Sequence, residues 1–96
     1  MIKVIEGLKI KDEEGMQLIL LKLRTNVMQY PGFITAEFLR NEHDISLILI
    51  ISTWQKTEFW RGWSESRIMK DLYRQAEISL VDGPRVSMYN IIPTRV

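Results

Sequence analysis

The chain has 96 residues and a mass of 11.4 kDa, so we expect a single domain spanning 1–96. Hydrophobic residues make up 46% and charged residues 26% of it, a balance typical of folded rather than disordered proteins. The net charge is only +1 and no long run of Lys and Arg occurs, which argues against a nucleic-acid partner.

Cysteine is absent from the sequence, which excludes disulfides, thiolate metal sites and thiol nucleophiles, and fits a reducing compartment. No apolar run approaches the roughly 18 residues that suggest a membrane span, and charges interrupt the N-terminal stretch. The sequence therefore predicts a soluble, cytoplasmic protein with no membrane partner.

The first third of the chain predicts a strand followed by a helix. Residues 1–11 alternate with period two, which places Ile2, Val4, Leu8 and Ile10 on one face. Asp12 is a suitable N-cap for a helix over about 13–30, which Pro31-Gly32 ends. The apolar stripe of that helix comprises Met16, Leu20, Leu23, Val27 and Tyr30, widened by Ile19 and Leu21.

Two strands are predicted next, over 33–40 and 45–54, with a polar hairpin loop at 41–44. Thr57 can cap a short helix to about residue 64, and Ser66 can cap another with Ile68, Leu72 and Ala76 on one face. These are either two helices or one bent helix. A turn at 82–84 precedes a final strand over 85–92.

The order strand, helix, strand, strand, helix, strand predicts an α+β fold of the ferredoxin-like split βαβ type, with a four-stranded antiparallel sheet and its helices on one side. The segment 45–51 is apolar on both sides of the pleat, so both faces of that strand need a cover. The helices cover one face only, and we therefore expect a homodimer joined through the sheet faces. A monomer with a tolerated apolar face is the alternative.

Three tryptophans and a phenylalanine lie within ten residues, namely Trp54, Phe59, Trp60 and Trp63. Trp63 shares a helix face with both Phe59 and Trp60, at spacings of four and three. An indole offers a large apolar plate and one N–H donor, which suits a pocket for a flat ligand. Aromatic side chains also dominate the cores of small domains, so a purely structural role is the alternative.

The same region resembles the antibiotic biosynthesis monooxygenase family. The shared pattern is a Pro-Gly-Phe turn, a Trp that ends a strand, an aromatic residue six positions on, a second Trp three later and a Ser three after that. In this sequence these are Pro31-Gly32-Phe33, Trp54, Trp60, Trp63 and Ser66. The resemblance implies a dimeric α/β barrel.

The resemblance also implies one of two chemistries. One branch of the family oxidises phenolic polyketide intermediates with O₂ and no cofactor, while another binds haem and breaks its ring. In the haem branch the residue matching Trp63 is the pocket tryptophan, and a histidine ten residues later ligates the iron. This sequence has Tyr73 at that position and lacks the Asn of the first strand. A tyrosinate can nevertheless ligate ferric haem.

For the cofactor-free chemistry, Phe59, Trp60 and Trp63 could form the wall that binds a planar substrate. Tyr73 could donate a hydrogen bond to the developing oxyanion. Glu6 and Glu37 lie on predicted strands, but strand carboxylates more often face solvent, so neither is assigned as a base. His43, the only histidine, lies in the hairpin loop, and no metal site is predicted.

Three functions follow from these features. The first is a small oxygenase without a cofactor, whose catalytic residues are Trp63 and Tyr73 and whose substrate-binding residues are Phe59, Trp60 and Trp63. The second is a haem-binding or haem-degrading protein with altered ligation. The third is a non-catalytic dimer that binds a small hydrophobic or aromatic ligand.

Overall fold

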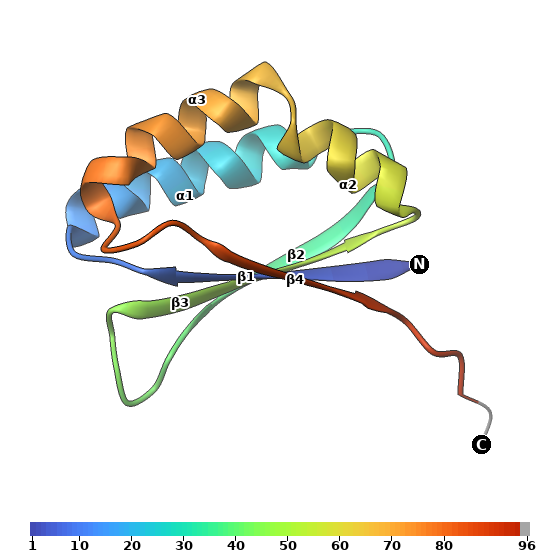
Figure 1. Ribbon diagram of the computed structural model, residues 1–96, viewed down its shortest axis with the longest axis horizontal. Coiled ribbons are helices and arrows are strands. Elements are labelled where there is room, and N and C mark those ends of the chain that lie inside the picture. Colours follow the sequence, from blue (N-terminus) through green and yellow to red (C-terminus); the bar gives the residue numbers. More distant parts are fainter. Residues whose placement is uncertain (95–96) are drawn as a thin grey trace.

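The computed structural model describes residues 1–94 and shows one sheet with a layer of helices on one side (Figure 1). The elements, in chain order, are β1 (Ile2–Lys9), α1 (Glu13–Val27), β2 (Phe33–Arg40), β3 (Leu47–Trp54), α2 (Thr57–Ser64), α3 (Arg67–Ala76), the short 3₁₀ turn η1 (Glu77–Ser79) and β4 (Arg85–Asn90). The strand order is β2-β3-β1-β4, and all neighbours are antiparallel. The predicted α+β, ferredoxin-like fold is confirmed.

The core lies between the helix layer and the covered face of the sheet. Alternation along β1 and β3 sends every second side chain into it, because neighbouring residues of a strand point to opposite faces. Four-residue and three-residue spacings on α1 and α3 supply the opposing side. The buried apolar residues of these four elements are Ile2, Val4, Leu8, Ile48, Ile50, Trp54, Met16, Ile19, Leu23, Val27, Met69, Leu72 and Ala76.

Two helix faces differ from their prediction. Leu21 is 62% exposed, because the buried stripe of α1 is centred on Ile19 and Leu23 and Leu21 lies on the other side. Ile68 is 49% exposed, and Met69 takes its expected place, since Met69, Leu72 and Ala76 repeat at spacings of three and four. The rest of the predicted stripe of α1 is correct, with Met16, Ile19, Leu23 and Val27 buried, and on α3 the predicted face is displaced by one residue at its start only.

Helix capping is confirmed at two positions and wrong at a third. The Ser66 hydroxyl accepts a hydrogen bond from the backbone N–H of Met69 at 3.2 Å, so α2 and α3 are two helices. Asp12 caps α1 as predicted, through a bond from the N–H of Gly15. Thr57 is the first residue of α2 rather than its cap, and Lys56, at the N-cap, makes no side-chain capping bond.

Four predicted elements are longer than the observed ones, and the first is β1, which covers Ile2–Lys9 within the predicted 1–11. β3 begins at Leu47 because Asp44 accepts bonds from both the N–H and the hydroxyl of Ser46, which holds residues 45–46 in the hairpin loop. β4 ends at Asn90, two residues early, and α1 ends at Val27, where turns carry the chain to Pro31.

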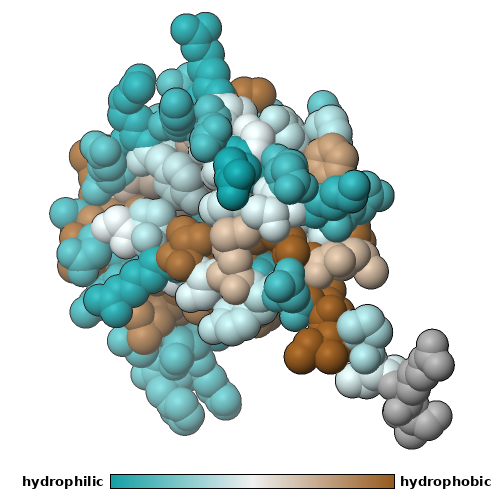
Figure 2. All heavy atoms as spheres, turned by 45° about the vertical axis from the view of Figure 1, so that its right-hand side comes forward, coloured by the Kyte–Doolittle hydropathy of each residue, from teal (hydrophilic) through white to brown (hydrophobic). Residues whose placement is uncertain are grey.

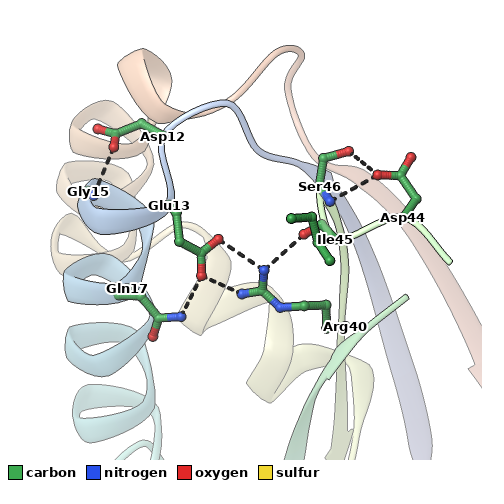
Figure 3. A network of polar contacts seen from close by, with 8 residues as sticks. All are labelled: Asp12, Glu13, Gly15, Gln17, Arg40, Asp44, Ile45 and Ser46. Carbon is green, nitrogen blue, oxygen red and sulfur yellow. Dashed lines mark hydrogen bonds and ion pairs between the residues drawn. The ribbon is translucent and has the colours of Figure 1, made fainter. Parts of the chain in front are cut away.

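An ion pair joins the helix layer to the hairpin (Figure 3). Both terminal nitrogens of Arg40 donate to the Glu13 carboxylate, at 2.6 and 3.0 Å, and one also donates to the carbonyl of Ile45 at 2.9 Å. The hydrogen bonds from Arg40 lower the pKa of Glu13. This contact fixes the first turn of α1 over the end of β2, on the opposite edge of the sheet from β4.

The second face of the sheet has no helix over it. Leu39, Leu47, Leu49 and Tyr89 remain 41%, 37%, 43% and 58% exposed there, around the half-buried Ile5 and Ile51. We call these six residues the open sheet face. Apolar side chains also reach the surface among hydrophilic ones in the view of Figure 2. No helix within residues 1–94 combines the length and the apolar character that crossing a membrane requires.

Candidate functional site

A carboxylate is buried at the centre of the covered sheet face. Glu6 lies on β1 between Val4 and Leu8 in the alternation, so its side chain points toward the helices, and it is only 5% exposed. Its neighbours across the sheet are Ile50 on β3 and Val86 on β4. A charged group in such surroundings is costly unless it is paired or hydrogen-bonded, and this burial is the unusual feature of the molecule.

Tyr73 is the hydrogen-bond partner of this carboxylate. Its hydroxyl, carried by α3, donates to Oε2 of Glu6 at 2.6 Å. Burial raises the pKa of Glu6 above its ordinary value, and the hydrogen bond from Tyr73 offsets part of that rise. The pKa of Tyr73 is also raised, by burial first, then by the charge of Glu6 and the hydrogen bond to it. The tyrosine therefore keeps its proton.

Trp60 on α2 is the third polar group at this place. Its indole nitrogen is fully buried and makes no hydrogen bond of ordinary geometry, the one such side-chain atom among residues 1–94. It lies close enough to Glu6 to lower the pKa of the carboxyl, after burial and the hydrogen bond from Tyr73 in order of effect. Proximity without the alignment of a hydrogen bond leaves Trp60 as a donor near Glu6 that remains unpaired.

The space beside Glu6 and Tyr73 is small. A cavity of about 10 Å³ lies between β1, α1 and α3, and apart from these two residues its lining is apolar. That is about the volume occupied by one water molecule. The cavity is thus a small, closely packed space around one carboxyl and one phenol.

The edge strand β4 leaves an open side next to this cavity. Val86 pairs with Glu6 and Met88 with Val4, so both face the helix layer, yet they are 44% and 41% exposed. Tyr73 and Trp60 are themselves only half-buried. Glu6 therefore lies at the boundary between the closed core and an uncovered apolar strip, which we call the β4 strip (Val86 and Met88).

Trp63 and Phe59 occupy a different cluster. Trp63 is 3% exposed and its ring meets that of Tyr30 edge-on at 5.5 Å. Tyr30 in turn contacts Trp54, whose indole N–H donates to the hydroxyl of Ser52 at 3.0 Å. Phe59 lies against the turn at 31–33. Neither lines the cavity at Glu6, so of the four residues singled out in the sequence the structure brings Tyr73 and Trp60 to the carboxylate.

The sequence places Glu6 on a strand but does not identify it as a base. The alternation of the strand predicts its burial. Glu6 is two residues from both Val4 and Leu8, so its side chain points to the same, buried face as theirs. The same test applied to Glu37 gives the opposite result. It pairs with Ile51 on the other face and is exposed.

Two larger hollows lie away from this cluster. One of about 530 Å³ lies at the end of β1 and β3, beside the turn at 82–83, and includes Leu47 and Leu49 of the open sheet face. The other, of about 280 Å³, lies between α1 and β2. Within residues 1–94 no three His, Cys, Asp or Glu side chains come together as a metal site, and His43 is exposed in the hairpin.

The architecture is that of small ferredoxin-like proteins with one helix-covered sheet face, and solved structures share it closely. A candidate antibiotic biosynthesis monooxygenase from Caulobacter crescentus aligns at a TM-score of 0.88 with 13% identity, over 96% of this chain and 90% of that one. SnoaB from Streptomyces nogalater, a cofactor-independent oxygenase, aligns at 0.86 with 10% identity, over 97% and 94%. Another antibiotic biosynthesis monooxygenase aligns at 0.78 with 19% identity, over 97% and 100%.

The resemblance read in the sequence is therefore matched by solved structures of that fold. At such identities the likeness defines the fold and leaves the activity open. No protein-family model matches the chain, and no curated protein matches it.

Proposed function

We propose that this protein is a small monooxygenase that uses O₂ without a cofactor and acts on a planar aromatic or polyketide-like substrate. The observation that supports it most is the buried cluster of Glu6, Tyr73 and Trp60 beside the uncovered β4 strip. A flat apolar molecule with one acidic hydroxyl matches that combination of apolar wall and hydrogen-bonding end.

In the proposed reaction the substrate supplies all the electrons. Once deprotonated it transfers them to O₂, one oxygen atom enters the product as a carbonyl, and the other leaves as water. The protein binds the ring on the β4 strip and Trp60, excludes bulk water, and offers hydrogen-bond donors to the substrate oxyanion. Tyr73 is the donor predicted from the sequence, and the unpaired N–H of Trp60 is a second.

Trp63 and Phe59 keep a role in this proposal. Trp63 follows Trp60 by three residues on α2, and its packing against Tyr30 fixes that helix on the sheet. Phe59 holds the preceding turn of α2 against residues 31–33. Direct contact of either residue with the substrate, as the sequence suggested, is a prediction that the Trp63→Phe variant tests through the KM of the substrate.

We further propose that the protein works as a homodimer in the cytoplasm, with the two open sheet faces packed together into a barrel. The apolar character of that face supports the pairing. The absence of cysteine supports a reducing compartment.

Haem is the alternative cofactor, and the residues present do not suit it. Ligation of ferric iron would require Tyr73 as a tyrosinate, whereas burial and the neighbouring Glu6 raise its pKa and its hydroxyl is bound to that carboxylate. Titration with hemin tests this directly, and an altered Soret band that disappears in Tyr73→Phe would contradict our interpretation.

Oxygen consumption decides between an enzyme and a ligand-binding protein. Purified protein is supplied with planar phenols of one to three rings, and dissolved oxygen is followed with an electrode. We expect uptake with at least one of them and its loss in Tyr73→Phe. Binding of the same phenols, seen as quenching of tryptophan fluorescence, without any oxygen uptake would instead support the non-catalytic ligand-binding dimer.

A further inference from the structure

We propose that Glu6 is the general base of this site, and that the substrate enters as a neutral phenol or enolisable ketone and gives its proton to the Glu6 carboxylate. This rests on the proposed function for the identity of the substrate class. It assigns a base that neither the aromatic pattern nor the likeness to known structures supplies.

The two oxygens of the carboxylate are in different situations. Oε2 accepts the hydrogen bond from Tyr73. Oε1 has no hydrogen bond of ordinary geometry from residues 1–94, and the indole N–H of Trp60 lies near the carboxylate without such a bond. Oε1 is therefore the oxygen left to take a proton, and the side of Val86, the half-exposed neighbour of Glu6 on β4, is the one from which a substrate could reach it.

The surroundings leave Glu6 as the one acidic group available. Every other residue that lines its cavity, from β1, β3, α1, α3 and the segment after η1, is apolar apart from Tyr73. On the β4 side its neighbour is Val86. A substrate lying on the β4 strip would therefore meet a single carboxylate at its polar end, with no competing charge.

The step itself moves one proton. The O–H bond of the phenol, or the C–H bond beside the ketone, breaks and leaves its electron pair on the substrate as a phenolate or enolate. Oε1 of Glu6 gains the proton and becomes a neutral carboxyl. Burial favours that neutral form and makes the carboxylate a stronger base than an exposed glutamate.

Protonation of Glu6 also changes what Tyr73 can do. In the ground state the only proton of the Tyr73 hydroxyl is committed to Oε2. A neutral carboxyl holds that hydrogen bond less strongly than a carboxylate does, so Tyr73 becomes free to donate to the new oxyanion. Trp60, already unpaired, can donate at the same time. The proton transfer thus frees one of the two donors that stabilise its product.

The test uses 4-nitrophenol, whose ionised form absorbs visible light. The experiment is done without oxygen, at a pH where the free probe is mostly neutral. Binding is followed by tryptophan fluorescence, ionisation by absorbance, and proton release by an indicator dye in weak buffer. For the wild-type protein we expect bound probe to ionise with no proton released to the solvent, because Glu6 takes it. Glu42→Gln, in the exposed hairpin, is the matched control and should behave the same.

Glu6→Gln keeps the size of the side chain and an acceptor for Tyr73, so the fold is expected to persist, which circular dichroism checks. This variant should bind the probe without ionising it, or release one proton for each probe that ionises. Its oxygen uptake with the best phenol should fall about 10²- to 10⁴-fold. Proton release by the wild-type protein, or equal ionisation without release in Glu6→Gln, would overturn the assignment.

The failures of the two proposals look different. Oxygen uptake that persists in Glu6→Gln removes the base and leaves the oxygenase. Ionisation of the probe by Glu6 with no oxygen uptake from any phenol removes the oxygenase and leaves the base. A wild-type protein that does not bind 4-nitrophenol at all contradicts the site on which both are built.

Discussion

Phe59 lies directly over Gly32, with its ring where a side chain on residue 32 would have to be. Gly32 has a φ of +80°, in the left-handed region that other residues rarely adopt. Its carbonyl accepts a hydrogen bond from the N–H of Gln55 at 2.9 Å, which ties the turn after α1 to the end of β3. This contact positions the first turn of α2, and with it Trp60.

The Gly32→Ala variant should therefore lose stability for two reasons, the positive φ and the overlap with the Phe59 ring. We expect the free energy of unfolding to fall by at least about 2 kcal/mol. Urea denaturation measures it. Gly83→Ala is the control, since no heavy atom lies within 4 Å of a methyl group there, and it should change stability by less than about 0.5 kcal/mol. Equal losses in the two variants would contradict this account of the turn.

Burial of Glu6 predicts how stability depends on pH. Because its pKa is raised in the folded state, that state binds more protons than the unfolded chain between pH 4.5 and the raised value. The free energy of unfolding contributed by Glu6 is therefore complete below pH 4.5 and declines as the pH rises through the folded pKa. A tenfold difference in proton affinity between the folded and unfolded states corresponds to about 1.4 kcal/mol of stability.

Glu6→Gln removes this decline. Thermal denaturation of both proteins from about pH 4 to about pH 9, a range that spans the titration of a raised carboxyl, gives a difference curve that isolates Glu6. The stability of the variant relative to that of the wild type should increase as the pH rises. Glu42→Gln should follow the wild type throughout, because that side chain is exposed. A flat difference between Glu6→Gln and the wild type would show that Glu6 titrates like an exposed glutamate.

Trp60 and Trp63 should respond differently to mutation although they lie on one helix. Trp63→Ala removes a ring that is 3% exposed and packed against Tyr30, so it should destabilise the fold by about 3–5 kcal/mol. Trp60→Phe removes an N–H that has no hydrogen-bond partner within residues 1–94, so it should cost less than about 1 kcal/mol. Urea denaturation of both variants measures the two losses.

Activity should show the reverse order. Loss of one oxyanion donor lowers turnover about 10²- to 10³-fold, which is our expectation for Trp60→Phe in the oxygen assay. Trp63→Phe, which keeps an aromatic ring in the core, is the comparison for the same assay. If Trp63→Phe loses more activity than Trp60→Phe while both stay folded, the direct catalytic role first predicted for Trp63 is favoured.

The fold could be predicted well because its long-range order depends on strong local signals. The two-sided apolar run at 45–51, the turn at Pro31-Gly32 and the cap at Ser66 each set an element that the structure confirms. The phase of the helices was weaker, because adjacent apolar residues such as Ile68 and Met69 fit one face equally well until the sheet selects between them.

The site was harder to predict because it joins residues 67 positions apart. Nothing local in the sequence pairs Glu6 with Tyr73, and general burial statistics for glutamate point to solvent. For the aromatic residues the local pattern is misleading. Their spacing on α2 predicts one shared environment for Trp60 and Trp63, whereas Trp63 packs against Tyr30 and Trp60 lies near Glu6. Only the packing of α3 over β1 shows which aromatic side chain accompanies the carboxylate.

The proposed dimer makes the last prediction. Leu49 is flanked by Gly7 and Leu39 in the middle of the open sheet face and is 43% exposed in one chain. Lysine at this position remains hydrated in a monomer but would place a charge among the apolar side chains of two packed faces. We expect Leu49→Lys to raise the dimer dissociation constant at least about a hundredfold, equivalent to about 2.7 kcal/mol.

Light scattering should then give twice the 11.4 kDa of one chain for the wild-type protein and 11.4 kDa for Leu49→Lys. Leu18→Lys is the control, because Leu18 is 62% exposed on α1, away from the open sheet face, and its dimer should persist. Unfolding curves distinguish lost association from lost folding, since the charge at position 49 leaves the helix-covered core intact. A wild-type protein that is monomeric at micromolar concentration would contradict the proposed dimer, because the open sheet face would then be exposed to water.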